Sequence, residues 1–203
     1  MNTPVVIRWL GHAAYKITMG ESSVVLDPFA PGTVPGFKDI CETADLVLCS
    51  HGHHDHNHAD AVTLTGKAPA FSVEKIETFH DDVQGAKRGP NTIHILNFDG
   101  VRVVHFGDLG CPLTEEQAAA LAGADVVLIP VGGFYTIDAA AAKTVIEQIR
   151  PKAAVPMHYR TEKFGLGAIA PLDDFLALWD APVLLGKDTL TVGEAEGIVV
   201  LDY

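Results

Sequence analysis

The sequence predicts an α/β fold in which helices cover β-sheets, that is, a layered α/β sandwich. Short β-type segments fill the first half of the chain, helical and β-type segments alternate after residue 110, and β-type segments return at the end. The later helices each carry one apolar stripe, so each must lie on a sheet face that needs cover. No linker, repeat or low-complexity tract interrupts residues 1–203, which indicates one domain.

The first half of the chain is a series of short segments with β-type composition. Met19-Gly20-Glu21 is a turn between two of them, and Asp99-Gly100 is a strong signal for a two-residue hairpin. The predicted strands are Val5–Leu10, Ala13–Thr18, Ser23–Asp27, Asp45–Cys49, Ala70–Val73, Thr92–Phe98 and Val101–Phe106.

The second half alternates between helices and strands. Thr114 and Gln117 have the spacing of a capping box, which predicts a helix that begins after Thr114. Apolar residues three and four apart predict a helix that ends before Pro151 and another near residues 172–179. The two stripes are Ala142, Val145, Ile146, Ile149 and Leu172, Phe175, Leu176, Trp179, and the predicted strands are Asp125–Pro130, Ala153–Met157 and segments near Val183, Leu190 and Ile198–Leu201.

The composition limits the classes of partner. Of 203 residues, 14 are Lys or Arg and 26 are Asp or Glu, so the net charge is −12. This charge disfavours binding to the phosphates of nucleic acids or to anionic membranes. The start of the chain lacks the features of a secretory signal, and Cys41, Cys49 and Cys111 are odd in number with no Cys-x-x-Cys motif. We therefore expect a cytoplasmic protein that acts on a small molecule, with its oligomeric state left open.

A cluster of histidines carries the strongest chemical signal. Five of the ten histidines fall between residues 51 and 58, where the pattern His-x-His-x-Asp-His directly follows a predicted strand. Alternate side chains of an extended backbone share a side, so His51 and His53 can bind one metal ion. Asp55 and His56 are consecutive and diverge, which suits a second ion nearby. Imidazole with carboxylate is the ligand set of zinc and its first-row neighbours rather than of calcium or magnesium.

Other residues of the same types stand where predicted strands or irregular segments end. His80 follows an irregular stretch, whereas Asp108 and His158 follow apolar strands. Such strand-end side chains are what a metal site at a sheet edge requires. His105 is interpreted as a core histidine or one that lies behind the ligands. His12 either approaches the site or packs as a strand-end histidine.

Further motifs accompany the histidine cluster along nearly the whole chain. They are Trp9-Leu-Gly-His12, Leu26-Asp27-Pro28, Gly107-Asp108-Leu-Gly110, Gly132-Gly-Phe-Tyr-Thr136-x-Asp138 and Pro156-Met-His158-Tyr159. Together with Ser50-His51-x-His53-x-Asp55-His56 and His80, they resemble the metallo-β-lactamase-fold hydrolase superfamily, and most closely the compact branch related to L-ascorbate-6-phosphate lactonase.

The resemblance implies a four-layer αβ/βα sandwich with two divalent metal ions at the sheet edges, most readily Zn²⁺, with Mn²⁺ or Fe as alternatives. It implies that Asp108 bridges the two ions and that Asp27 orients the histidine loop from behind. The implied ligands are His51, His53 and His80 for the first ion, and Asp55, His56 and His158 for the second.

The implied activity is hydrolysis of an ester-type bond in a small molecule by a metal-bridged hydroxide, with Asp55 and Asp108 as catalytic residues. A lactone, a carboxylic ester or a phosphodiester fits equally well, and the substrate can be anionic. The candidates for holding it or donating a proton are Lys87, Arg88, Tyr135 and Tyr159. The alternatives are a di-iron redox enzyme on the same fold and a non-catalytic metal-binding protein.

Overall fold

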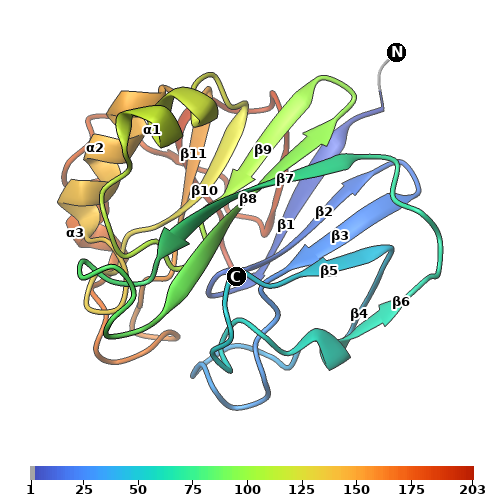
Figure 1. Cartoon of the computed structure of the whole chain (residues 1–203), viewed down its shortest axis with the longest axis horizontal. Coiled ribbons are helices and arrows are strands. Elements are labelled where there is room, and N and C mark those ends of the chain that lie inside the picture. The colour runs from blue at the N-terminus through green and yellow to red at the C-terminus, as the bar shows by residue number, and fades with distance from the viewer. Residues whose placement is uncertain (1–2) are drawn as a thin grey trace.

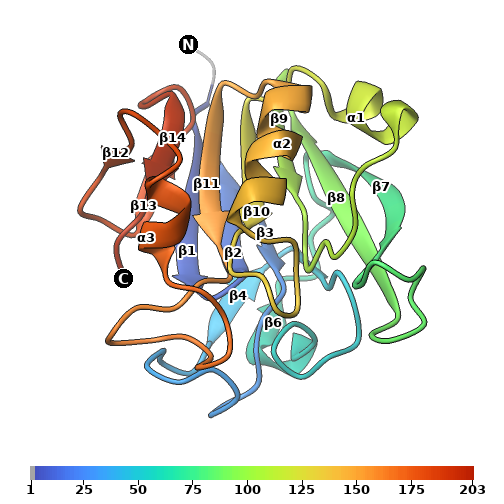
Figure 2. The ribbon, with the colours of Figure 1, turned by 90° about the vertical axis from the view of Figure 1, so that its left-hand side faces the viewer.

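The computed structural model describes residues 3–203 and shows two β-sheets packed face to face (Figure 1). A layer of helices covers the outer face of the larger sheet (Figure 2). The predicted class, an α/β sandwich, is confirmed. Among the described residues, no helix is long and apolar enough to cross a membrane.

The smaller sheet comes mainly from the N-terminal part of the chain. Its strand order is β13-β1-β2-β3-β5, and side chains of β1 alternate between buried and partly exposed positions, as expected for a strand with one face on the core. Both ends of the chain contribute, since β13 pairs with β1. The strands are β1 (Val5–Gly11), β2 (Ala14–Met19), β3 (Ser22–Leu26), β5 (Leu46–Leu48) and β13 (Thr189–Thr191).

The larger sheet has seven strands in the order β12-β14-β11-β10-β9-β8-β7. The strands β10 and β11 pair in parallel and are buried along their whole length, because helices cover one face and the smaller sheet covers the other. The predicted hairpin at Asp99-Gly100 is confirmed, with φ of 44° and 89°. The strands are β7 (Ser72–Phe79), β8 (Pro90–Phe98), β9 (Val101–His105), β10 (Val126–Pro130), β11 (Ala153–Met157), β12 (Val183–Leu184) and β14 (Gly197–Val200).

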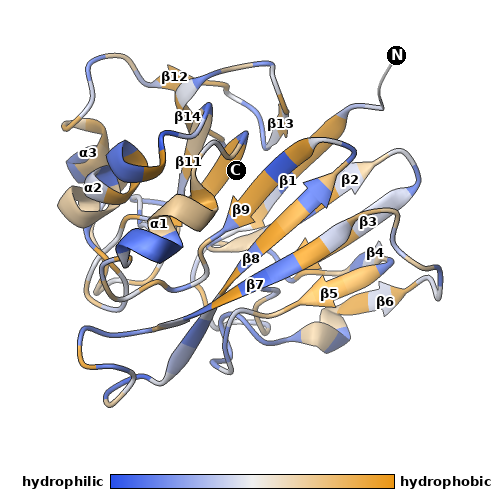
Figure 3. Ribbon diagram, turned by 45° about the horizontal axis from the view of Figure 1, so that its top comes forward, coloured by the Kyte–Doolittle hydropathy of each residue, from blue (hydrophilic) through white to orange (hydrophobic). Residues whose placement is uncertain are grey.

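Three helices form the outer layer over the larger sheet: α1 (Glu115–Leu121), α2 (Ala139–Ile149) and α3 (Leu172–Leu176). The predicted capping box of α1 is present, with Thr114 and Gln117 bonding reciprocally. The predicted apolar stripe of α2 is its buried face. Helix α3 ends earlier than its stripe predicts, and the chain continues in turns to Trp179. Figure 3 shows the strands mainly apolar and the start of α1 hydrophilic.

The outer face of the smaller sheet is covered differently. Two short strands, β4 (Glu42–Ala44) and β6 (Val62–Leu64), pair with each other, and a 3-10 turn spans Ala59–Ala61. Val25 of β3 packs against Ala44 and Val62. Within residues 3–203 all α-helices lie on the other side of the molecule, so this fourth layer consists of the strand pair and of loop residues. These strands are too short to be recognised by their periodicity.

Candidate metal centre

The candidate ligands all follow the C-terminal ends of strands. His12 follows β1, the histidine loop follows β5, and His80 follows β7 directly, because that strand extends beyond the predicted Val73 to Phe79. Asp108 and His158 follow β9 and β11. Within each sheet these strands run in the same direction, as the pairings show, so the loops meet at one edge (Figure 2).

Three histidines form the first group. His51, His53 and His80 each offer a ring nitrogen, and these atoms lie within 4.8 Å of one another. Their ring centroids are 4.5–5.0 Å apart. The structure therefore brings together the residues that were predicted to bind the first ion. His53 is the most exposed of the three and His80 is buried.

The second group contains one residue more than the sequence predicted. Asp55, His56 and His158 lie together as expected, and His12 joins them, with all four ligand atoms within 4.8 Å. The three histidines of this group are fully buried. His54 and His58, the other histidines of this segment, belong to neither group.

Asp108 lies between the two groups. One of its carboxylate oxygens is 3.2 Å from His80 Nε2 and 3.3 Å from His158 Nε2, and the other is 3.1 Å from His56 Nε2. Burial alone would raise the pKa of Asp108, but the charges of the surrounding histidines, His158 first, hold it well below its usual range. This placement suits a residue that bridges two cations.

Asp27 supports the centre from behind. Its carboxylate accepts hydrogen bonds from the Ser50 backbone N–H and hydroxyl, both at 2.6 Å, and lies 2.8 Å from His56 Nδ1. With Nδ1 bound to Asp27, His56 presents Nε2 to the centre. Burial would raise the pKa of Asp27, yet His105 and these hydrogen bonds lower it to about 2. Asp27 also lies within 4.8 Å of a ring nitrogen of His51 and of His56. Its oxygens, however, are used in the contacts with Ser50 and His56.

Two further residues hold the loops, and one of them was not anticipated. His105 Nε2 lies 2.8 Å from the Ala13 carbonyl, and its Nδ1 accepts from the Gly107 N–H, so it is a core histidine that joins the two sheets. Asn91, within β8, accepts a hydrogen bond from the Asp108 N–H at 2.9 Å. The sequence carried no signal for Asn91, because an isolated amide in a strand has no distinctive pattern.

The donor set fits metal ions. Several buried side-chain atoms that face the centre make no hydrogen bond, although an unsatisfied buried polar atom costs about 1–3 kcal/mol. A divalent ion in each group would use these lone pairs. Burial also lowers the pKa of His51 to about 3, which keeps the imidazole neutral, the form that binds metal. The unpartnered atoms include His51 Nε2, His56 Nε2, Asp108 Oδ1 and both ring nitrogens of His12 and His158.

A cavity of about 300 Å³ opens onto this centre. Its lining comprises His53, Asp55, His80, Arg88, Asp108, Tyr135 and Leu166. Of the four residues that were candidates for holding the substrate or donating a proton, only Arg88 and Tyr135 line this cavity. Lys87 instead lies 3.2 Å from Asp82, and Tyr159 is buried against the Trp9 ring.

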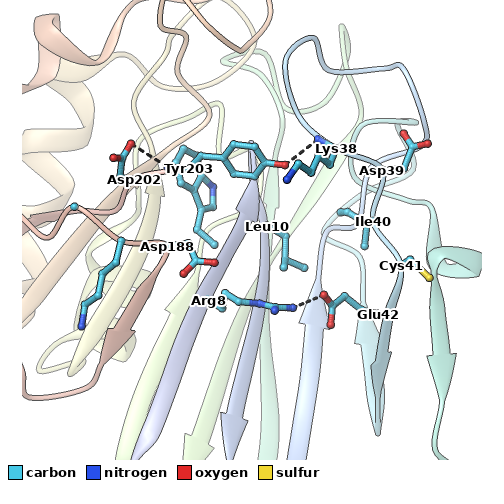
Figure 4. Close-up of a pocket in the computed structure, with 13 residues that line it drawn as sticks. Arg8, Leu10, Lys38, Asp39, Ile40, Cys41, Glu42, Asp188, Asp202 and Tyr203 are labelled. Atoms are coloured by element: carbon cyan, nitrogen blue, oxygen red, sulfur yellow. Dashed lines mark hydrogen bonds and ion pairs between the residues drawn. The ribbon is translucent and has the colours of Figure 1, made fainter.

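A larger cavity of about 570 Å³ shares no lining residue with the first (Figure 4). Arg8 forms an ion pair with Glu42 across it, and the Tyr203 hydroxyl accepts a hydrogen bond from the Lys38 backbone N–H. Its lining contains no histidine. The side chains that could bind metal ions therefore gather at the smaller cavity.

Known proteins share this fold and this sequence pattern. The family model of the β-lactamase superfamily domain matches residues 6–158. The chain belongs to the β-lactamase superfamily. It is 31% identical to a protein from Archaeoglobus fulgidus named UPF0173 metal-dependent hydrolase, over 76% of this chain and 83% of that one. A protein of the same name from Methanoregula boonei is 32% identical, over 80% and 86%.

Solved structures of the superfamily have the same architecture. The crystal structure of a metallo-β-lactamase superfamily member from Thermotoga maritima superposes with a TM-score of 0.74 at 30% identity, covering 97% of this chain and 98% of that chain. The resemblance seen in the sequence is thus confirmed at the level of the superfamily. Its closer relation to L-ascorbate-6-phosphate lactonase stays a prediction.

Proposed function

We propose that this β-lactamase superfamily member is a dinuclear metal-dependent hydrolase that cleaves an ester-type bond in a small molecule. One observation carries the proposal: two groups of ligand-type side chains, joined by Asp108, lie at the base of a cavity. The names of its relatives, metal-dependent hydrolases, support the same activity.

The residues around the cavity have separate tasks in this proposal. Two divalent ions, when bound, lower the pKa of a water molecule and offset negative charge that develops on the substrate. Asp55 lines the cavity and orients the attacking water through its carboxylate. Asn91 and the surrounding histidines hold Asp108 in place, so that Asp108 fixes the two ligand groups relative to each other. The imidazole and carboxylate donors favour Zn²⁺, with Mn²⁺ or Fe as alternatives.

The substrate we propose is a small anion. Arg88 is the one Lys or Arg side chain in the described lining of the cavity, and within residues 3–203 it forms no ion pair with a carboxylate. Its guanidinium donates a hydrogen bond to the Phe134 carbonyl at 2.8 Å and lies over the Tyr135 ring. The remaining N–H groups are free to bind a carboxylate or phosphate. The net charge of −12 favours this over nucleic acid or a membrane, and the unpaired cysteines favour the cytoplasm.

Metal analysis followed by a substrate panel tests the function. Protein loaded with zinc, manganese or iron should hold two ions per chain, and it should hydrolyse at least one class among lactones, carboxylic esters, thioesters and phosphodiesters. Activity should be lost on chelation and return with metal. The Asp108→Ala variant should lose metal and turnover together, because it removes the shared ligand. Fewer than one ion per loaded chain would contradict the proposal, and iron-dependent oxygen consumption without hydrolysis would favour the redox alternative.

A further inference from the structure

His12 occupies an unusual place at the metal centre. It lies in the turn between β1 and β2, is fully buried, and has a left-handed backbone with φ of 53°. A left-handed non-glycine residue costs about 1–3 kcal/mol, and such residues persist where the surrounding structure requires them. His158 has the same strained conformation, with φ of 55°. The two strained histidines face each other with ring centroids 4.1 Å apart.

The separations of the rings place His12 among the ligands of the second group. The His12 ring is 5.4 Å from that of His56, whereas the two predicted histidine ligands, His56 and His158, are 5.8 Å apart. The three rings of the first group are 4.5–5.0 Å apart, so the spacing around His12 is of the same order. Its Nε2 lies 3.5 Å from Asp55 Oδ2.

The bonding of His12 differs from that of a histidine that only packs. Both of its ring nitrogens are buried without a hydrogen-bond partner. His105 is equally buried, yet both of its nitrogens are engaged, by the Ala13 carbonyl and the Gly107 N–H. A metal ion is the group that would use a lone pair of His12, since three other donors already surround the same point.

We propose that His12 is a fourth protein ligand, besides the bridging Asp108, of the ion bound by Asp55, His56 and His158. This inference rests on the proposed metal centre, and it makes the two sites unequal. With Asp108 counted, the second ion would have five protein ligands and the first ion four, so the ion of the three-histidine site has more room for water or substrate. His53 and His80 of the three-histidine site line the cavity, whereas only Asp55 of the second group does. We therefore expect the first ion to be the one that meets the substrate and the second ion to exchange more slowly.

The test uses metal binding rather than turnover. In the His12→Asn variant, asparagine tolerates the left-handed backbone but removes the imidazole. The matched control is His94→Asn, because His94 is also a buried histidine with an unpartnered Nδ1 but belongs to neither ligand group. Cobalt(II) titration followed by visible absorption, together with elemental analysis after dialysis, reports each site separately.

We expect wild type and His94→Asn to retain two ions per chain and His12→Asn to retain one. The affinity for the lost ion should fall by at least about 100-fold, since the removal of groups that merely support ligands already costs 10–100-fold. Chelator should remove the two wild-type ions in two phases. Retention of two ions at wild-type affinity in His12→Asn would overturn the inference, as would the loss of both ions from a variant that still melts cooperatively. A wild-type chain that binds fewer than two ions would instead refute the dinuclear centre itself.

Discussion

Three of the seven non-glycine residues that have a left-handed backbone within residues 3–203 belong to the metal centre. His12, Asp27 and His158 are non-glycine residues with φ between 44° and 55°, each directly beyond the end of a strand. The conformation costs about 1–3 kcal/mol per residue. The hydrogen bonds of Asp27 offset part of that cost, whereas the ring nitrogens of His12 and His158 have no such partner.

Asp27 gives the first prediction. Asp27→Asn should weaken binding of the second ion by about 10–100-fold, because an amide oxygen cannot replace two carboxylate oxygens toward Ser50 and His56. Calorimetric titration with zinc measures the change. Asp45→Asn is the control, since Asp45 is another buried aspartate but bonds to Ser23 and Thr65 away from the centre. Equal weakening in both variants would show a general effect on folding instead.

Arg88 gives the second prediction. Arg88→Ala should raise KM for an anionic substrate by about 10–100-fold, since hydrogen bonds to charged groups contribute about 1.5–3 kcal/mol. KM for a neutral ester, and metal content, should stay within about twofold. Lys87→Ala is the control, because the neighbouring cation bonds to Asp82 and does not line the cavity. Steady-state kinetics with a phosphodiester and a neutral carboxylic ester make the comparison, and equal losses for both substrates would rule out anion recognition.

At the level of elements, glycines allow the strand-end loops to approach one another. A Cβ on Gly110 would lie 2.3 Å from the backbone carbon of His80 and 2.4 Å from the backbone nitrogen of Asp81. A Cβ on Gly132 would lie 2.1 Å from the His158 carbonyl oxygen. Contacts with backbone atoms at these distances force a shift of the ligand-bearing segment.

This close approach gives the third prediction. Gly110→Ala should lower stability by about 1–3 kcal/mol and reduce metal binding at the three-histidine site, because the added methyl group displaces the backbone of His80. Urea unfolding and metal analysis measure the two effects. Gly52→Ala, within the histidine loop itself, is the control, since its Cβ would meet no atom within 4 Å. If the two variants behave alike, loop approach at Gly110 does not determine the site.

The histidine cluster and the end of β7 show which elements of the site could be predicted from the sequence. The histidine cluster was predictable because its ligands lie within six consecutive residues, 51–56, and follow a recognisable apolar run, Asp45–Cys49. The end of β7 was placed too early, because Glu74, Lys75 and Glu77 are exposed on this edge strand and interrupt the apolar pattern. The position of His80 therefore looked irregular, although it follows the strand directly.

Hydrogen bonds within the loop of residues 81–88 set one remaining feature of the site. The sequence did not distinguish Lys87 from Arg88 as the cavity residue. The distinction comes from Asp81, whose carboxylate accepts hydrogen bonds from four backbone N–H groups, those of Val83, Gly85, Lys87 and Arg88. Burial alone would raise the pKa of Asp81, but these bonds lower it to about 2. In the resulting loop Arg88 lines the cavity and Lys87 does not, a difference that residue types and spacing alone do not predict.

For the whole molecule, the candidate centre joins the two sheets. His12 and residues 51–56 come from the smaller sheet, whereas His80, Asp108 and His158 come from the larger one. The apolar core holds the sheets together with or without ions, as the buried Ile7, Leu26, Ile95, Val104 and Phe106 indicate. Bound ions would add a cross-link at the edge where the sheets meet, so metal binding and folding stability should be coupled.

This coupling gives the fourth prediction, that chelation lowers the melting temperature without unfolding the protein at room temperature. An ion at about 100 times its Kd stabilises the native state by about 2.7 kcal/mol per site. In a chain of 203 residues, 1 kcal/mol corresponds to roughly 2–4 °C. Removal of one ion should therefore lower Tm by about 5–10 °C, and removal of the second should lower it further. Scanning calorimetry with and without chelator measures the shift, and Asp108→Ala should show little of it because it lacks the shared ligand. An unchanged Tm in wild-type protein, once its metal content has fallen to zero, would show that the ions do not connect the sheets.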